Sequence, residues 1–131
     1  MSLEQIKGQI SRGEFYVARD QVQSRIVGAL RLIWSDPQVW PNSDGPAGYV
    51  HGLVIDRAFS GDSMGERLLR WARRRSAEED AQYLRLDCVE TNVRLRRYYV
   101  DAGFIEVGRR DFGDDVDNGW FRVVLFERSL T

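Results

Sequence analysis

The chain has 131 residues, which is long enough for one domain with a proper core and too short for two. Its formal net charge is −1, with 30% charged and 43% hydrophobic residues, an ordinary balance for a globular protein. This balance excludes a chain whose overall field attracts nucleic acid or an anionic membrane. Cys88 is the only cysteine, so an intramolecular disulfide is excluded and a reducing, cytoplasmic compartment is expected.

The N-terminal stretch Ser2–Arg12 is predicted to form a short amphipathic helix. Leu3, Ile6 and Ile10 recur at helical spacing, and Gly13 follows just past the expected end. No apolar run in the chain approaches the roughly 20 residues of a membrane span, and the start lacks the apolar segment of a signal peptide.

Two strands and a long loop are predicted next. Glu14–Arg19 carries aromatic and β-branched residues and Ser24–Trp34 is rich in isoleucine, valine and leucine, so the two segments are expected to pair as an antiparallel hairpin. Asp36–Pro46 contains all three prolines and is predicted to be a loop. Trp40 within it either lies at the mouth of a ligand site or packs over the sheet edge, and packing is favoured.

The stretch Val50–Gly65 has the pattern of a strand, a tight turn and the start of a helix. Val50–Ile55 is apolar and partly β-branched, small residues follow, and a helical pattern then runs from about Gly65 to Glu79. Such a turn presents unpaired backbone N–H groups, and the helix dipole adds partial positive charge. It is therefore either a phosphate site or an ordinary strand-to-helix connection.

The remaining elements complete an α/β (α+β) pattern. The sequence predicts a strand at Tyr83–Cys88, a helix from Thr91 or Asn92 to about Ala102, a strand from Phe104 toward Phe112, an acidic turn at Gly113–Gly119 and a last strand at Trp120–Glu127. The strand–helix–strand unit predicts a right-handed parallel crossover, and the other neighbours are expected to be antiparallel. We therefore expect one mixed, twisted, mostly antiparallel sheet with a central parallel pair and flanking helices, in a single domain spanning residues 1–131.

This order of elements, with a pyrophosphate-type turn after the middle strand, resembles the GNAT superfamily of acyl-CoA-dependent N-acyltransferases. Two segments carry the likeness: LVIDRAFSGDSMGERLL from Leu53 to Leu69, similar to the acyl-CoA motif, and TNVRLRRYYVDAGF from Thr91 to Phe104. The second matches the family's asparagine, its tyrosine seven residues on, and the Gly-Phe that ends the helix.

The sequence departs from the family pattern at the turn and at the start. The family's turn reads Gln/Arg-x-x-Gly-x-Gly/Ala, whereas Ser60 stands at the first position and Ser63 at the middle glycine, with Gly65 at the last. Both serines can donate hydroxyl hydrogen bonds, and Asp62 puts a carboxylate beside the anion site. The chain also begins late relative to the family, as an N-terminally short member.

The resemblance implies acetyl-CoA, or another acyl-CoA, as co-substrate, and no metal. Backbone amides of the turn would hold the pyrophosphate, a splayed middle strand would pair with pantetheine and supply an oxyanion donor, and an asparagine would bind the pantetheine amides. For Asn92 a pure helix-capping role is an equal alternative. The implied cofactor-binding residues are Leu53, Val54, Ile55, Ser60, Gly61, Asp62, Ser63, Met64, Gly65, Glu66, Asn92 and Tyr99.

Two residues are catalytic candidates. The family match makes Tyr99 the general acid that returns a proton to the departing thiolate, with core packing as its alternative. His51 is the only histidine, and an unperturbed histidine side chain has a pKa of about 6.5, which suits a base for the incoming amine. Strand alternation is expected to put His51, Leu53 and Tyr49 on one face, with Tyr49 relaying a proton. A structural role for His51 is the alternative.

The predicted function is therefore N-acetyl transfer from acetyl-CoA to the amine of a small molecule or a protein by direct attack. A degenerate family member that binds CoA or a partner without catalysis is the alternative, and a nucleotide-binding protein unrelated to CoA ranks below both. The implied partner is an amine acceptor, with no nucleic acid and no membrane, and homodimer formation is left open.

Overall fold

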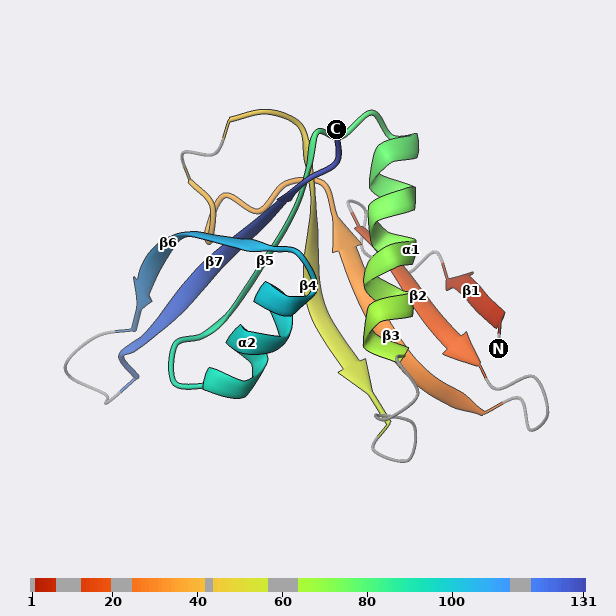
Figure 1. Ribbon diagram of the computed structural model, residues 1–131, viewed down its shortest axis with the longest axis horizontal. Helices are drawn as coiled ribbons and strands as arrows, with labels where there is room; N and C mark the ends of the chain where they lie inside the picture. Colours follow the sequence, from red (N-terminus) through yellow and green to blue (C-terminus); the bar gives the residue numbers. More distant parts are fainter. Residues whose placement is uncertain (1, 7–12, 20–24, 42–43, 57–63, 114–118) are drawn as a thin grey trace.

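A computed structural model describes residues 2–6, 13–19, 25–41, 44–56, 64–113 and 119–131. Within these ranges the chain forms seven strands and two helices (Figure 1). In chain order they are β1 (Ser2–Ile6), β2 (Gly13–Arg19), β3 (Ile26–Ile33), β4 (Ala47–Ile55), α1 (Met64–Glu78), β5 (Tyr83–Val89), α2 (Val93–Asp101), β6 (Ile105–Phe112) and β7 (Phe121–Ser129).

The described strands form one sheet in the order β1-β2-β3-β4-β5-β7-β6. β4 and β5 are parallel, and every other neighbouring pair is antiparallel. The predicted mixed sheet with a central parallel pair is thus confirmed. The last strand, β7, lies between β5 and β6, an insertion that the hairpin-like order of the sequence did not reveal.

The prediction of an N-terminal helix at Ser2–Arg12 is wrong for residues 2–6, the part of this segment that the structure describes. Ser2–Ile6 is β1, which pairs antiparallel with β2 from Ser2 opposite Arg19 to Ile6 opposite Phe15. A helix this short is marginal on its own, whereas pairing with a strand of high β propensity satisfies the backbone groups of the segment. Residues 7–12 lie outside the described part of the chain.

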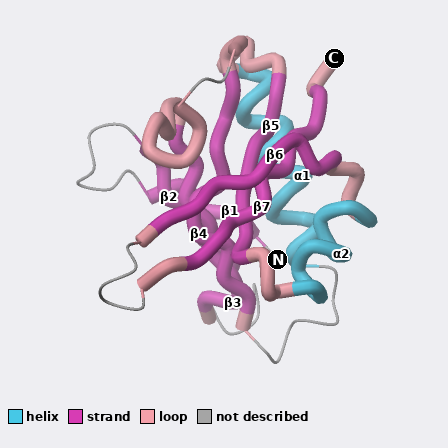
Figure 2. The backbone as a smooth tube through the Cα atoms, turned by 90° about the vertical axis from the view of Figure 1, so that its left-hand side faces the viewer, coloured by secondary structure: helices cyan, strands magenta, loops and turns pink. Residues whose placement is uncertain are grey.

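Both helices cover the same face of the sheet, as Figure 2 shows. The main core lies under them and contains Met64, Leu68, Leu69 and Ala72 of α1 together with Tyr99 of α2. The segment that follows β3 covers the other face, where a second cluster forms around buried Trp40 and Tyr49. Trp40 therefore packs over the sheet, as the favoured of its two alternatives predicts.

The other predicted helices and strands are confirmed, with bounds shifted by a few residues, whereas residues 114–118 of the predicted acidic turn lie outside the described part of the chain. α1 buries the stripe that its helical spacing predicts, and Asn92 caps α2 through its side-chain oxygen, which accepts a hydrogen bond from the Leu95 amide at 3.1 Å. Gly103, with φ of +95°, ends α2 in the left-handed conformation that glycine adopts without strain. Neither described helix is long and apolar enough to cross a membrane.

Candidate active site

β4 and β5 separate soon after they begin. Their ladder covers only Ala47–Tyr49 and Tyr83–Arg85, although β4 continues to Ile55 and β5 to Val89. β4 stays paired with β3 on its other edge through Ile55. Within the described residues, the edge of β4 that faces β5 has no ladder partner beyond Tyr49, and Figure 1 shows the two strands diverging. Backbone groups along such an opening can hydrogen-bond an extended, amide-containing ligand.

A β-bulge in β4 sets which side chains face the opening. One β3 residue, Arg31, stands opposite two β4 residues, His51 and Gly52, and Gly52 has φ of +82°. The extra residue shifts the alternation, so Val50 and Leu53 both pack against the main core although they are three positions apart. The expectation that His51 and Leu53 share a face is therefore wrong.

His51 lies on the face opposite the helices. Its side chain is exposed. Burial raises the pKa of two nearby carboxyl groups, those of Asp36 and Asp87, and the charge of His51 opposes part of this rise. Asp87 alternates with Leu86 and Cys88, which belong to the core under the helices, so Asp87 projects from the other side of β5. His51 therefore shares a face with Tyr49, as predicted, and not with Leu53.

The three β4 residues expected along pantetheine lie at the opened part of the strand. Leu53 and Ile55 are half-buried and pack against the core under the helices, while the side chain of Val54 is 66% exposed. All three pair with β3, opposite Leu30, Ala29 and Gly28. Their second edge is the one that β5 leaves open, so the backbone of these residues is available on the side where the sequence predicts the ligand.

The predicted pyrophosphate turn is described only in its last residues. Ser60, Gly61, Asp62 and Ser63 lie outside the described part of the chain. Met64 and Gly65 are buried in the first turn of α1, and Glu66 in the same turn is exposed. The first N–H groups of a helix lack intrahelical partners, so this end of α1 supplies donors and a positive dipole where the turn meets the helix.

The two α2 residues singled out by the sequence have different environments. Asn92 is exposed, and its side-chain oxygen is engaged as the helix cap, which leaves the side-chain NH₂ group as the part able to reach a ligand amide. Tyr99 is only 4% exposed and packs against Phe104 and Phe126 with ring centroids 6.0 and 5.6 Å apart. These contacts hold the Tyr99 ring in one place.

Burial raises the pKa of the Tyr99 phenol well above its ordinary value, and Cys88, Asp87 and Tyr98 raise it further. The phenol is therefore protonated at neutral pH, as a proton donor must be. Burial likewise raises the pKa of the Cys88 thiol to about 11, with Asp87 as the next cause. Cys88 is thus an unreactive buried thiol.

Asp87 and Asp36 are candidate site residues that the sequence reasoning missed. Burial raises the pKa of the Asp87 carboxyl, and the charge of Asp36 raises it further, while His51 lowers it. The charge of Asp87 also contributes, after burial and Cys88, to the raised pKa of the Tyr99 phenol. Polar Arg85 and Asp87, alternating with Leu84 and Leu86 in YLRLDC, were the signal available in the sequence.

Arg85 organises the face beneath these groups. It is 3% exposed, its Nε donates to a Glu127 oxygen at 2.8 Å, and its Nη1 donates to the Tyr49 hydroxyl at 2.9 Å. Its guanidinium also lies 5.3 Å from the centre of the Trp40 ring. The Tyr49 hydroxyl, predicted to relay a proton, thus accepts a hydrogen bond from a buried cation.

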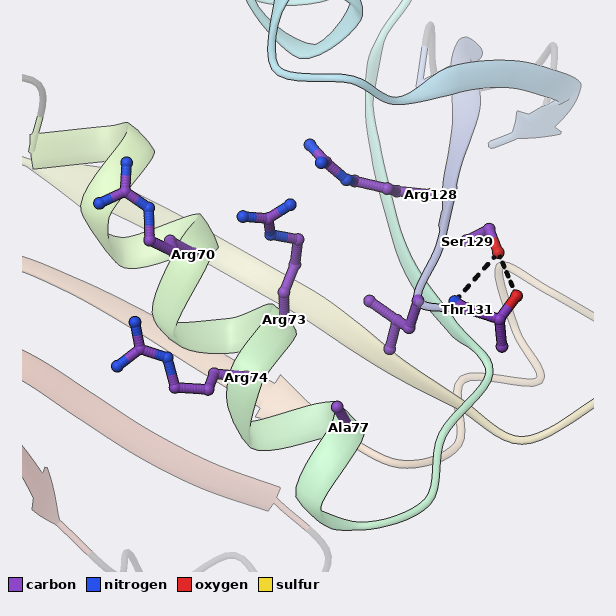
Figure 3. A pocket seen from close by; sticks show the side chains of 8 residues that line it. Arg70, Arg73, Arg74, Ala77, Arg128, Ser129 and Thr131 are labelled. Atoms are coloured by element: carbon purple, nitrogen blue, oxygen red, sulfur yellow. Dashed lines mark hydrogen bonds between the residues drawn. The ribbon is translucent and has the colours of Figure 1, made fainter.

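Two hollows lie outside the opening, along the exposed side of α1. The larger, of about 420 Å³, runs between α1 and the end of β7 and is shown in Figure 3. The second, of about 250 Å³, continues it toward the end of α2. Both are lined by Arg70, Arg73 and Arg128, and neither includes a β4 residue.

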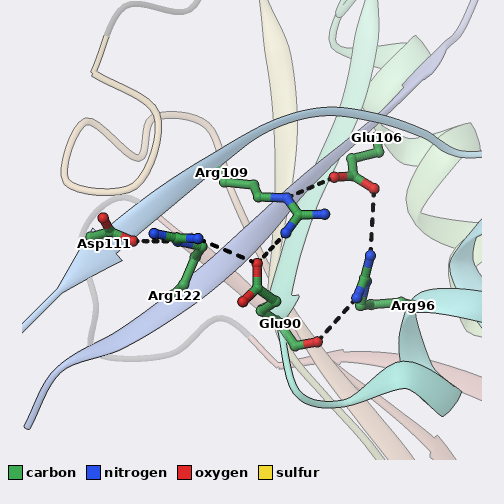
Figure 4. A network of polar contacts seen from close by, with 6 residues as sticks. All are labelled: Glu90, Arg96, Glu106, Arg109, Asp111 and Arg122. Carbon is green, nitrogen blue, oxygen red and sulfur yellow. Dashed lines mark hydrogen bonds and ion pairs between the residues drawn. The ribbon is translucent and has the colours of Figure 1, made fainter.

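A polar network holds the end of β5, the start of α2, β6 and β7 together (Figure 4). Glu90 accepts from Arg109 and lies 3.8 Å from Arg122, and Arg96 donates to the Glu90 backbone oxygen at 3.2 Å. Arg122 also donates to Asp111 at 2.7 Å. Exposed pairs of this kind contribute little singly, so the network chiefly fixes geometry near Asn92.

The opened parallel pair, the helix N-terminus beside it and the buried tyrosine of α2 define the class of acyl-CoA-dependent N-acyltransferases. Residues 3–104 match the model of the acetyltransferase (GNAT) family. The chain belongs to that family. The uncharacterized N-acetyltransferase YesJ of Bacillus subtilis is 27% identical over 135 residues, covering 98% of this chain and 68% of that protein.

Solved structures agree in fold. An acetyltransferase from Bacillus anthracis in complex with acetyl coenzyme A has a TM-score of 0.73 at 18% identity, covering 92% of this chain and 64% of that chain. An IAA acetyltransferase from Bacillus cereus has a TM-score of 0.73 at 16% identity, with 98% of both chains covered. A spermidine N-acetyltransferase mutant from Vibrio cholerae has a TM-score of 0.71 at 15% identity, covering 93% of this chain and 68% of that chain.

Proposed function

We propose that this chain transfers the acetyl group of acetyl-CoA directly to a primary amine. The observation that carries the proposal is the opening of β4 and β5 after three residue pairs, with a protonated phenol on one side and titratable groups on the other. Membership of the family supports the reaction class, and the acetyl-CoA complex of a protein with the same fold supports the co-substrate. The single, buried Cys88 supports a cytoplasmic setting.

In this proposal the co-substrate lies along the opened edge of β4. Backbone groups of Leu53, Val54 and Ile55 pair with the amides of pantetheine, and the side-chain NH₂ of Asn92 binds one of their carbonyls. The start of α1 receives the pyrophosphate, with Ser60 to Ser63 of the preceding turn contributing donors. One backbone N–H of β4 stabilises the oxyanion, for which a well-aimed donor can contribute about 3 kcal/mol.

The chemical step forms a C–N bond and breaks a C–S bond. The neutral amine attacks the thioester carbonyl and forms a tetrahedral oxyanion whose nitrogen carries an extra proton. The nitrogen loses this proton to solvent, and the oxyanion collapses with departure of the CoA thiolate. Tyr99 hydrogen-bonds the developing thiolate and passes its proton to sulphur, and solvent then reprotonates the tyrosinate. Because its raised pKa disfavours a free tyrosinate, we propose that the proton moves only as the C–S bond breaks.

The proposed base that deprotonates the amine lies on the face of the sheet opposite the helices. An alkylammonium has a pKa of about 10.4, so only about 0.1% is neutral at pH 7 and a base accelerates attack. His51 is our candidate, with Asp87 and Asp36 beside it. These two carboxylates also favour an acceptor that brings positive charge, so we propose a cationic amine as the substrate class. A spermidine N-acetyltransferase shares the fold.

The test is amine-dependent release of CoA thiol from acetyl-CoA, measured with a thiol reagent across a panel of mono-, di- and polyamines. We expect release with cationic primary amines and none with quaternary analogues, which cannot accept an acetyl group. Calorimetry with CoA runs in parallel. CoA binding without release for any amine would overturn catalysis and favour the non-catalytic alternative, while absence of CoA binding would overturn both.

A further inference from the structure

The two hollows along α1 form one continuous trough, because Arg70, Arg73 and Arg128 line both of them. On α1 the lining runs from Glu66 to Ala77, about 16 Å at 1.5 Å per residue. The opposite wall is the end of β7, where the Ser129 and Thr131 hydroxyls lie 3.0 Å apart. Figure 3 shows the Arg73 and Arg128 side chains in the space between α1 and β7, whereas the Arg74 guanidinium extends away from β7.

Four arginines contribute to this trough: Arg70, Arg73, Arg74 and Arg128. Within the described residues, none of them forms an ion pair with a carboxylate; Arg128 donates to the Ala102 backbone oxygen. The arginines of the network in Figure 4 differ, since Arg96, Arg109 and Arg122 all have carboxylate partners. The trough therefore contains four arginines without carboxylate ion-pair partners among the described residues, although Glu66 and Asp101 also line its part toward α2.

The cations of the trough repel one another. Burial lowers the pKa of the Arg73 guanidinium, and the charges of Arg128, Arg70 and Arg74 lower it further. Like charges held together cost stability, and an anion in their midst removes that cost. Guanidinium groups bind phosphate through paired N–H donors, and the two hydroxyls opposite can donate to the same group.

We propose that this trough binds a phosphate monoester. Two sources share that chemistry. One is the 3′-phosphate of CoA, whose pyrophosphate would lie at the start of α1, where the trough begins at Glu66; this source rests on the proposed function. The other is an independent phosphorylated ligand that binds whether or not CoA does. A dianionic phosphate matches the trough better than a carboxylate, because it can accept from several guanidinium groups at once.

The first arm of the test compares CoA with 3′-dephospho-CoA by calorimetry. The wild-type chain, the variant Arg70→Gln/Arg73→Gln and the control Arg94→Gln/Arg109→Gln are titrated at fixed ionic strength. The control removes the same charge from exposed positions of α2 and β6 that do not line the trough. If the source is CoA, wild type and control bind CoA about tenfold or more tightly than dephospho-CoA, and the trough variant binds the two equally.

The second arm titrates inorganic phosphate against the same three proteins and follows the thermal midpoint. One outcome assigns the site to an independent phosphate ligand. In it, inorganic phosphate raises the thermal midpoint of the wild type and the control but not that of the trough variant, and the wild type binds CoA and dephospho-CoA equally. Equal behaviour of the trough variant and the control in both arms would overturn the proposal. Failure of both CoA forms to bind would overturn the proposed function, while the phosphate arm would still decide the trough.

Discussion

The Tyr98 hydroxyl of α2 lies against Gly65 of α1, at a point only 2.2 Å from where a Cβ on Gly65 would stand. This contact joins the two sequence segments that carry the family resemblance. The contact explains why position 65 is a glycine without invoking a bound phosphate. A side chain at this position in the first turn of α1 would collide with the Tyr98 hydroxyl. Tyr98 therefore sets the spacing of the two helices beside the opening.

Gly65→Ala is expected to destabilise the fold. The added methyl meets the Tyr98 hydroxyl at 2.2 Å and Ile55 Cδ1 at 3.0 Å, so the helices must separate or the ring must move. Overpacking of this kind costs about 1–3 kcal/mol. Urea denaturation measures the cost, and the double variant Gly65→Ala/Tyr98→Phe should recover part of it. If the two single effects simply add in the double variant, the contact does not couple the two residues.

Arg85→Met is expected to destabilise the fold by about 3 kcal/mol or more, because it leaves Glu127 facing the sheet without its cation. Arg85 and Glu127 are direct cross-strand partners of β5 and β7. Replacing both groups removes the unpaired charge, so Arg85→Met/Glu127→Leu should be more stable than Arg85→Met. Urea denaturation of the two variants decides the matter, and a double variant less stable than Arg85→Met would contradict this account.

Asp87→Asn is expected to gain stability relative to the wild type as the pH rises from acid to neutral. Burial raises the pKa of the Asp87 carboxyl, so the folded chain binds this proton more tightly than the unfolded chain. The resulting stabilisation is full below the ordinary carboxyl pKa of about 3.9 and is lost as pH rises through the raised value. Asparagine mimics the protonated form and removes this loss.

The measurement is urea denaturation of wild type and Asp87→Asn at pH 4 and pH 7. Asp80→Asn is the control, because Asp80 is exposed and asparagine tolerates its left-handed backbone, with φ of 61°. We expect the stability of Asp87→Asn relative to wild type to increase between pH 4 and pH 7. A difference that is the same at both pH values would show that Asp87 has no shifted pKa.

His51→Ala is expected to change the pH dependence of kcat/KM for an accepted amine. If His51 takes the proton of the amine, the acidic limb of the profile reports its titration and is lost in the variant. Asp87→Asn is the comparison, since Asp87 lies on the same face and influences the same region. A profile for His51→Ala with the wild-type shape would remove His51 from the role of base.

The sequence predicts most of this fold because most elements follow their own periodicity. α1 and α2 bury the stripes that their spacing indicates, and Asn92 and Gly103 bound α2 as their capping chemistry requires. The spacing of Leu3 and Ile6 led to the wrong prediction of a helix, because a short apolar pattern fits a helix or a strand. Pairing with β2 makes this segment a strand. The position of β7 between β5 and β6 depends on long-range pairing that no local pattern encodes.

The site was predictable to the extent that its motifs are local. The side of the sheet on which His51 lies relative to Leu53 could not be predicted, because the bulge at Gly52 shifts the alternation of β4 by one residue. Asp87 escaped notice because its importance comes from burial and from Asp36, a residue distant in sequence. The arginines of α1 alone do not indicate a binding site, because only the position of β7 gives them a second wall.

The most direct test of the proposed mechanism is the turnover of Tyr99→Phe with acetyl-CoA and an accepted amine, alongside its affinity for CoA. Phenylalanine keeps the ring contacts with Phe104 and Phe126 and removes only the hydroxyl. If Tyr99 donates the proton to the departing thiolate, kcat falls by about 100-fold while the CoA affinity stays at the wild-type level. Turnover equal to that of the wild type would contradict this account.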